Sequence, residues 1–183
     1  MIEIDNLSGN FLISLENQQG NFFSKSLIWI IEHSDSGSLG LVINKPFLKK
    51  VRNTLDVKTD KLKKQAKIRD FGPVERARLF LIHAGTSDVR KTNSLEIGAD
   101  LFFSEYSPSI FATQSSLRQT LVGVGYSGWG PGQLESEIVA NFWLLAPFDR
   151  KIVFDVPDKR KLATAANSIG VDLNLLPRNI GHG

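Results

Sequence analysis

Short apolar runs bounded by polar turn residues recur along the chain and predict a set of strands. Residues 27–31 are apolar at five consecutive positions, which is typical of a strand buried on both faces of a sheet. The turn cluster Ser-Asp-Ser-Gly-Ser at 34–38 follows, so this strand and the next predict a β-hairpin. The predicted strands span residues 11–15, 26–33, 39–44, 78–83, 120–126 and 151–155, with a further ribbon from 94–97 and 101–104 around Gly98.

Other segments repeat their apolar residues every three or four positions, as amphipathic helices do. The clearest case follows Pro131, where Leu134, Ile138 and Phe142 form one stripe. Glu135 lies in the first turn of this predicted helix, where the helix dipole favours negative charge. The other predicted helices cover residues 47–55, 59–67, a turn that starts at Ser107-Pro108, and 157–170.

The order of these elements predicts the fold class. Strands and helices alternate, but hairpins and single helices are mixed rather than arranged as strict βαβ units, so we expect an α+β fold with helices packed on a mixed sheet. The 183 residues are expected to form a single domain, 1–183, with a basic helical segment at 45–69.

Composition excludes several classes of protein. With 42% hydrophobic and 22% charged residues, the chain is an ordinary globular protein. It has no cysteine, which excludes disulfides, thiolate catalysis and zinc fingers and suits a reducing cytoplasm. The apolar run at 27–31 is too short to span a membrane, and the N-terminus carries acid where a signal peptide carries Lys or Arg. We therefore expect a cytoplasmic protein with no membrane partner.

The net charge of +3 is unevenly distributed. Residues 45–69 hold ten basic and two acidic side chains, a net charge of +8 that leaves −5 for the rest of the chain. Such a segment is either a weak patch for an anionic partner or, more simply, a solvated lysine-rich helical arm. Neither a helix-turn-helix nor an aromatic RNA-binding motif is present, so direct sequence-specific binding of nucleic acid is disfavoured. The patch residues are Lys61, Lys63, Lys64 and Lys67.

The glycine-rich stretch 122–145 predicts a joint at which a strand turns into a helix. Gly125-Tyr126-Ser127-Gly128-Trp129 nearly matches a nucleophile elbow, but Trp129 stands where the elbow requires glycine. The glycines that follow are no phosphate-binding loop, because no Gly-Lys-Ser/Thr is present and Glu135 would repel phosphate. Turn geometry explains these glycines better. Trp129 is the aromatic residue that we expect to be partly exposed and to floor a pocket, with Trp29 and Trp143 in the core.

The histidines and glutamates leave two interpretations open. His33, His83, Glu32, Glu135 and Glu137 are able in principle to form a metal site or an acid–base pair, but their spacing matches no metal signature. We predict no catalytic residue, no metal and no cofactor. The candidate ligand- or partner-binding residues are His33, Asn44, His83, Trp129, Gln133, Glu135 and Asn141.

Several blocks of residues resemble the AlgH/YqgE family of bacterial proteins. They are FFSKSLIWIIEHSDSGSLGLVINKP at 22–46, FGPV at 71–74, the apolar Leu-Ile-His at 81–83, VGYSGWGPGQLESEIVANFW at 124–143 and Gly-His at 181–182. The resemblance spans nearly the whole chain in family order. It implies a compact single domain whose mixed, mainly antiparallel sheet is curled into a pseudo-barrel with helices around it. Family members are often labelled transcriptional regulators, a label that rests on genetics.

The residues and the resemblance together predict a regulatory protein that binds a protein or small-molecule partner without catalysis. The alternative is a hydrolase-like or metal-assisted enzyme that uses a pocket near His33, His83 and Glu135. Convergence of these side chains and Trp129 on one cavity would favour the enzyme, and their dispersal would favour the binding protein.

Overall fold

A computed structural model describes residues 6–15, 21–47, 67–84, 94–98, 100–112 and 119–175. These residues form an α+β fold, as predicted. The strands are β1 (Phe11–Ser14), β2 (Leu27–Ser34), β3 (Gly37–Val42), β4 (Ile68–Asp70), β5 (Val74–Ala84), β6 (Leu95–Glu96), β7 (Leu101–Glu105), β8 (Leu121–Trp129) and β9 (Trp143–Ala146). The helices are α2 (Pro108–Ala112), α3 (Gln133–Val139), α4 (Arg150–Phe154) and α5 (Asp158–Ser168).

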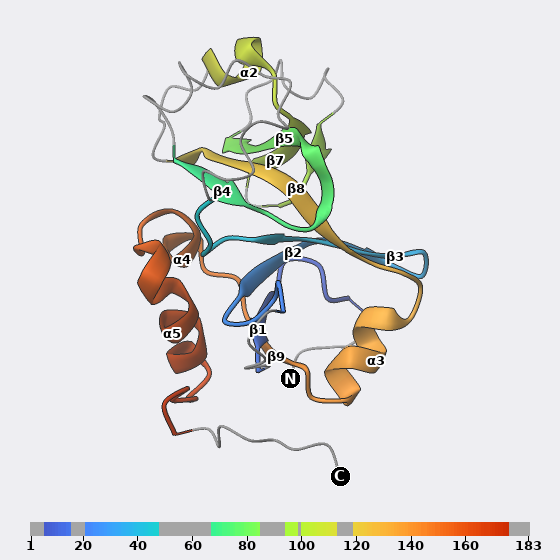
Figure 1. Ribbon diagram of the computed structural model, residues 1–183, viewed down its shortest axis with the longest axis vertical. Helices are drawn as coiled ribbons and strands as arrows, with labels where there is room; N and C mark the ends of the chain where they lie inside the picture. The colour runs from blue at the N-terminus through green and yellow to red at the C-terminus, as the bar shows by residue number, and fades with distance from the viewer. Residues whose placement is uncertain are drawn as a thin grey trace.

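All nine strands belong to one open, mostly antiparallel sheet (Figure 1). Eight of them follow the order β6-β7-β5-β8-β3-β2-β1-β9, and β4 lies beside β8 in the one parallel pair of the described strands. The predicted pseudo-barrel is wrong, because the sheet is neither closed nor strongly curled. Its end strands β6 and β9 have two and four residues and lie at opposite ends of the order, so no pairing among the described strands closes the sheet.

Strand β8 connects the two parts of this sheet. Residues 121–124 pair with β5 and β4, and Tyr126 pairs with Val74 of β5 after a register shift, whereas residues 127–129 pair with β3. Gly125 lies between these stretches with a φ of 68°, a conformation that favours glycine. The strand predicted over 120–126 therefore continues to Trp129, and Ser127 is a buried strand residue whose hydroxyl donates to the Phe71 carbonyl 3.2 Å away. Ser127 is thus not the nucleophile of an elbow.

Most of the other predicted elements are confirmed, and one is wrong. The hairpin of β2 and β3, the ribbon of β6 and β7, and helices α2 and α5 lie where the sequence predicts them. Residues 151–155, predicted as a strand, lie in helix α4 and its C-cap, because the Asp149 side chain accepts a hydrogen bond from the Lys151 N–H and caps this helix. Strands β4 and β9 were not predicted. The basic helices predicted at 47–55 and 59–67 lie outside the described residues except for Phe47 and Lys67, neither of which is helical.

Strands β1 and β2 are buried on both faces, and this places the helices. Phe11 and Trp29 belong to a cluster that includes Ala165 of α5. Leu12, which points to the other face, belongs to a cluster with Leu134 of α3. Helices α3 and α5 accordingly lie on opposite sides of this part of the sheet (Figure 1).

A cluster of charged side chains, here called the β4–α5 cluster, joins β4 to the start of α5. Its members are Lys67, Arg69, Asp158 and Lys161. Asp158 lies 2.6 Å from Lys67 Nζ, 3.1 Å from Arg69 Nη2 and 3.4 Å from Lys161 Nζ. Lys161 is fully buried and also donates to the Val153 carbonyl of α4 at 2.5 Å. Burial, and then the charge of Arg69, lower the pKa of Lys161 from 10.5 to about 8.

This buried lysine predicts an unusual dependence of stability on pH. Because the pKa of Lys161 is lower in the folded than in the unfolded chain, the unfolded chain binds more protons between pH 8 and pH 10.5, and stability rises over that window. From pH 7 to pH 10, the wild type should gain roughly 2 to 3 kcal/mol in free energy of unfolding relative to Lys161→Met. Urea denaturation at each pH measures this difference.

The control for this prediction is Lys159→Met, which removes an exposed lysine two residues away. Its free energy of unfolding should follow the wild type at every pH. If the free energies of unfolding of the wild type and Lys161→Met change in parallel with pH, the lowered pKa of Lys161 is wrong.

Candidate functional site

Glu137 of α3 binds two tryptophan indoles with one carboxylate oxygen. Its Oε2 accepts hydrogen bonds from Trp129 Nε1 at 2.9 Å and from Trp143 Nε1 at 2.8 Å. Its other oxygen accepts from Gln133 Nε2 at 2.9 Å. Phe23 stacks on Trp129 and lies edge-on to Trp143. We call Trp129, Glu137 and Trp143 the indole clamp. It joins α3 to the ends of β8 and β9.

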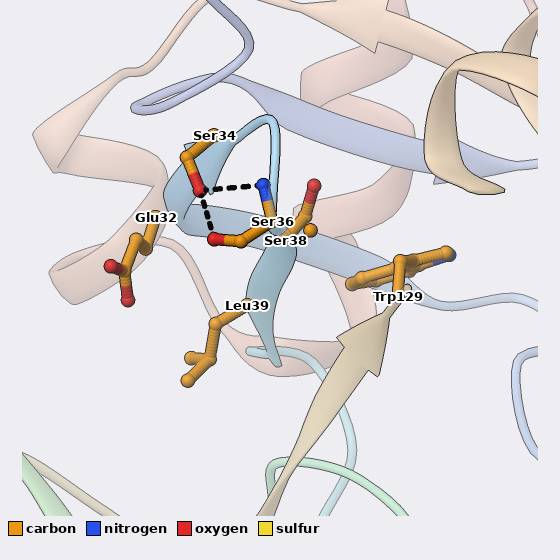
Figure 2. Close-up of a pocket in the computed structure, with 7 residues that line it drawn as sticks. Glu32, Ser34, Ser36, Ser38, Leu39 and Trp129 are labelled. Carbon is orange, nitrogen blue, oxygen red and sulfur yellow. Dashed lines mark hydrogen bonds between the residues drawn. The ribbon is translucent and has the colours of Figure 1, made fainter. Parts of the chain in front are cut away.

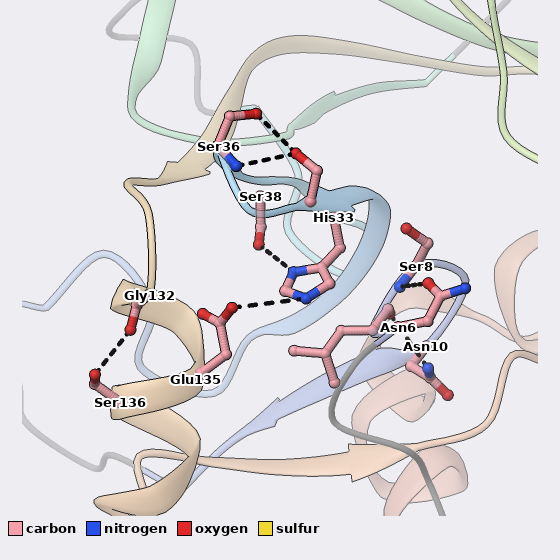
Figure 3. Close-up of polar contacts among 11 residues, drawn as sticks. Asn6, Ser8, Asn10, His33, Ser36, Ser38, Gly132, Glu135 and Ser136 are labelled. Carbon is pink, nitrogen blue, oxygen red and sulfur yellow. Dashed lines mark hydrogen bonds and ion pairs between the residues drawn. The ribbon is translucent and has the colours of Figure 1, made fainter.

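The opposite edge of α3 contacts the β2–β3 hairpin through a histidine (Figure 3). His33 faces Ser38 across the hairpin, and its Nδ1 lies 2.8 Å from Ser38 Oγ. Its Nε2 lies 3.7 Å from Glu135 Oε1, which forms an ion pair when the imidazole is protonated. The His33 side chain is 5% exposed and that of Glu135 is 32% exposed. Helix α3 therefore presents Glu135 to the hairpin and Glu137 to the two indoles.

A polar pocket of about 200 Å³ lies between the hairpin tip and the end of β8 (Figure 2). We call it the hairpin pocket; it is lined by Glu32, Ser34, Ser36, Gly37, Ser38, Leu39 and Trp129. Gly37 is required here, since a Cβ atom at this position would lie 2.3 Å from the Trp129 carbonyl oxygen, and its φ is 128°. Trp129 lines the pocket, but it is only 7% exposed, less than the sequence predicted.

His83 lies apart from His33, on β5 beside β7. It is fully buried, with Nε2 3.1 Å from Ser104 Oγ and Nδ1 3.1 Å from the Ala84 carbonyl. Its ring stacks on Phe102. Burial lowers the pKa of His83 below its usual value, which favours a neutral imidazole. These contacts are those of a core histidine, and they place it outside the group formed by His33 and Glu135.

The remaining candidate residues have local structural contacts. Asn44 accepts from the Leu27 N–H and donates to the Lys25 carbonyl, both at 2.9 Å, and so fixes the start of β2. Asn141 is exposed and has a φ of 59° just after α3. Gln133 is exposed and accepts from the Gly130 N–H at 3.0 Å. The structure thus brings His33, Glu135, Gln133 and Trp129 to one region.

The structure describes only part of the predicted basic patch and of the side chains that could bind a metal ion. Lys67 is described and lies in the β4–α5 cluster, whereas Lys61, Lys63 and Lys64 lie outside the described residues. Within the described ranges, no group of three or more His, Asp or Glu side chains is arranged to hold a metal ion. In the same ranges, no helix is both long and apolar enough to cross a membrane.

Comparison with known proteins identifies the family. The model of the AlgH-like family, a domain of unknown function, matches residues 11–174. The chain belongs to the AlgH-like family. A UPF0301 protein from Nitrosospira multiformis is 37% identical over 180 residues, covering 96% of this chain and 97% of that protein. Another from Pseudomonas putida is 34% identical and covers 96% of this chain and 95% of its own.

Two solved structures resemble this AlgH-like chain. The solution structure of AlgH from Pseudomonas aeruginosa matches with a TM-score of 0.73 and 33% identity, covering 100% of this chain and 99% of that one. A crystal structure of a Corynebacterium diphtheriae protein, 19% identical, matches with a TM-score of 0.71 over 96% of this chain and 93% of its own, and shows the fold alone. None of these names states an activity or a ligand.

Sequence reasoning missed several residues of this region. Residues 34–38 were assigned to a turn, but the strands continue to Ser34 and resume at Gly37, so Ser38 faces His33. Extending the predicted pairing of the two hairpin strands by one residue pair places Ser38 opposite His33. The sequence places Glu137 among the groups for a possible metal site or acid–base pair, but it does not predict the hydrogen bonds of Glu137 to Trp129 and Trp143. The four-residue spacing of Glu137 from Gln133 was the available signal that both side chains share a face.

Proposed function

We propose that this AlgH-like protein is a regulatory binding protein that holds a partner at the hairpin pocket without turning it over. The observation that carries this proposal is the pocket itself, an open polar depression between two fixed walls. One wall is the hairpin tip and the other is the end of β8 at Trp129, whose indole the clamp fixes against α3. Binding sites positioned by a rigid scaffold lose little entropy when they bind.

The chemistry of the pocket favours a cationic group. Glu32 supplies a carboxylate, and Ser34, Ser36 and Ser38 add further polar groups to the lining. None of the lining residues carries a positive charge. An ammonium or guanidinium group, carried by a small amine or by a basic side chain of a partner protein, forms charge-assisted hydrogen bonds with such a lining.

A titration with agmatine, a small guanidinium amine, tests this function. We expect the amide resonances of residues 32–39 to shift in spectra of ¹⁵N-labelled protein, and Glu32→Gln to weaken binding about tenfold through loss of a charge-assisted hydrogen bond. The matched control is Glu96→Gln on β6, which removes the same exposed charge outside the pocket. Absence of shifts at the hairpin, or equal weakening by both variants, would refute cation binding at this pocket.

One observation favours a second candidate function, a serine hydrolase. Ser38, His33 and Glu135 lie in the order nucleophile, base and acid, and Ser38 lines the pocket. In such a reaction His33 takes the proton of Ser38 as the hydroxyl oxygen attacks an ester carbonyl, and Glu135 stabilises the imidazolium. His83 has no role in this version.

Hydrolysis of p-nitrophenyl acetate distinguishes the two functions. The hydrolase predicts that Ser38→Ala abolishes the rate above background while Ser36→Ala, a change of the same kind in the same pocket, retains it. The binding protein predicts the same background rate for the wild type and both variants.

A further inference from the structure

The β4–α5 cluster carries more positive than negative charge. Lys67, Arg69 and Lys161 surround the single carboxylate of Asp158, so the four ionised side chains have a net charge of +2. Asp158 is held below its usual pKa by Lys67 and Arg69, although its burial opposes this, so it stays ionised at neutral pH. One carboxylate therefore leaves two cations of this cluster without a counter-charge inside it.

The cations of the cluster retain hydrogen-bonding capacity. The Arg69 side chain is only 13% exposed, and its Nε atom is buried without a hydrogen-bond partner among the described residues. Lys67 is 61% exposed, so its ammonium group faces solvent while one contact holds it at Asp158. An almost buried guanidinium beside a solvent-facing ammonium gives the cluster an open side.

We propose that the β4–α5 cluster is a binding site for a small phosphate-bearing ligand. A phosphate dianion matches the surplus charge of +2, and its oxygens accept hydrogen bonds from guanidinium and ammonium donors. The hairpin pocket lacks cations and holds Glu32, so it does not suit the same ligand. This site is independent of the proposed function, and failure of either leaves the other untouched. It gives Lys67 a role within the basic stretch that the sequence singled out.

Protonation of Lys161 links this site to pH. Burial holds the pKa of Lys161 at about 8. The groups that face it are Arg69 of β4, Lys67 just before β4, Asp158 of its own helix and the Val153 carbonyl of α4. A bound dianion favours the protonated lysine. Phosphate is a dianion throughout pH 8 to 10, so a loss of affinity over that window reports on Lys161.

Calorimetric titration with inorganic phosphate tests the proposal, with sodium chloride added to keep ionic strength constant. We expect the wild type to bind phosphate, and Lys67→Gln to weaken binding about tenfold because one charge-assisted contact is lost. The control is Lys159→Gln, which removes the same charge from an exposed neighbour of Asp158 and should leave the affinity unchanged. Arg69→Gln should weaken binding further. Since that variant removes a partner of Asp158 and can unfold the chain, Lys67→Gln carries the test.

Three outcomes would overturn the proposal. The first is a phosphate titration that releases no more heat than a titration with sodium chloride alone. The second is an equal loss of phosphate affinity in Lys67→Gln and Lys159→Gln. The third comes from a single-stranded oligonucleotide titrated at the same phosphate concentration. Binding that is far tighter than for phosphate and falls steeply with salt would assign Lys67 to a nucleic-acid surface instead. Affinity for phosphate that falls from pH 8 to pH 10 in the wild type but not in Lys161→Met would support the assignment of the site.

Discussion

Replacing Glu137 by alanine is expected to lower the free energy of unfolding by about 2 to 4 kcal/mol. The substitution removes the acceptor shared by the indole N–H groups of Trp129 and Trp143, and both tryptophans are buried. A buried donor left without an acceptor costs about 1 to 3 kcal/mol, and hydrogen bonds to a charged acceptor are at the upper end of that range. Chemical denaturation, followed by circular dichroism and tryptophan fluorescence, measures the loss.

A matched control for this prediction lies two residues away. Glu135→Ala removes a carboxylate from the same helix, but its ion-pair partner among the described residues, His33, is 3.7 Å away, and partly exposed ion pairs contribute about 0 to 1 kcal/mol. Glu137→Gln keeps one acceptor oxygen and should fall between the two alanine variants. If Glu135→Ala costs as much as Glu137→Ala, loss of a carboxylate from α3 in general, rather than loss of the indole clamp, explains the effect.

The indole clamp also bears on the proposed function. Trp129, at the end of β8, is one of the residues that line the hairpin pocket, and Glu137 fixes the position of its indole ring against α3. Glu137→Gln should therefore weaken agmatine binding without removing any group that lines the pocket. The role of Glu137 is to position Trp129 rather than to contact the ligand.

Much of the fold was predictable because the responsible signals are local. The run of five apolar residues in β2 reflects burial on both faces, and Pro157 and Gly170 bracket α5 as the usual helix signals do. Strands β4 and β9 were missed because each has three or four residues and is defined by its neighbours in the sheet. The sequence of α4 predicts a strand because its apolar, β-branched pair Ile152-Val153 favours one, and the cap at Asp149 that decides for a helix is a weaker signal.

The candidate site was only partly predictable, because its contacts are long-range. His33 and Glu135 are about a hundred residues apart, and only the pairing of β8 with β3 brings α3 to the hairpin. Each was a candidate by residue type, but no spacing in the sequence specifies their contact. His83 was grouped with them on equal grounds, although it lies in the core beside β7. The sequence also does not predict that the sheet is open, because closure of the sheet depends on a long-range contact between its two end strands.

Gly125→Ala is expected to be the most damaging single-methyl substitution considered, with a cost of about 4 kcal/mol or more. At this position β8 passes from the strands β4 and β5 to the strand β3, with a φ of 68°. A Cβ atom would lie 2.5 Å from the carbonyl oxygens of both Gly72 and Val74. These are backbone atoms, which cannot rotate away as a side chain does, so the strands must separate. Loss of soluble protein or of the cooperative unfolding transition is the expected result.

Gly132→Ala separates the two causes of the stability loss in Gly125→Ala, which are backbone strain at positive φ and the steric clash of the added Cβ atom. Gly132 precedes α3 with a φ of 69°, nearly that of Gly125, but a Cβ atom there would meet nothing within 4 Å. Its cost should be the backbone strain alone, about 1 to 2 kcal/mol for a non-glycine residue in the left-handed region. The difference between the two variants therefore measures the close approach of β8 to residues 72–74. If both variants lose the same stability, backbone conformation alone explains Gly125, and the close contact at this crossing of the sheet contributes nothing.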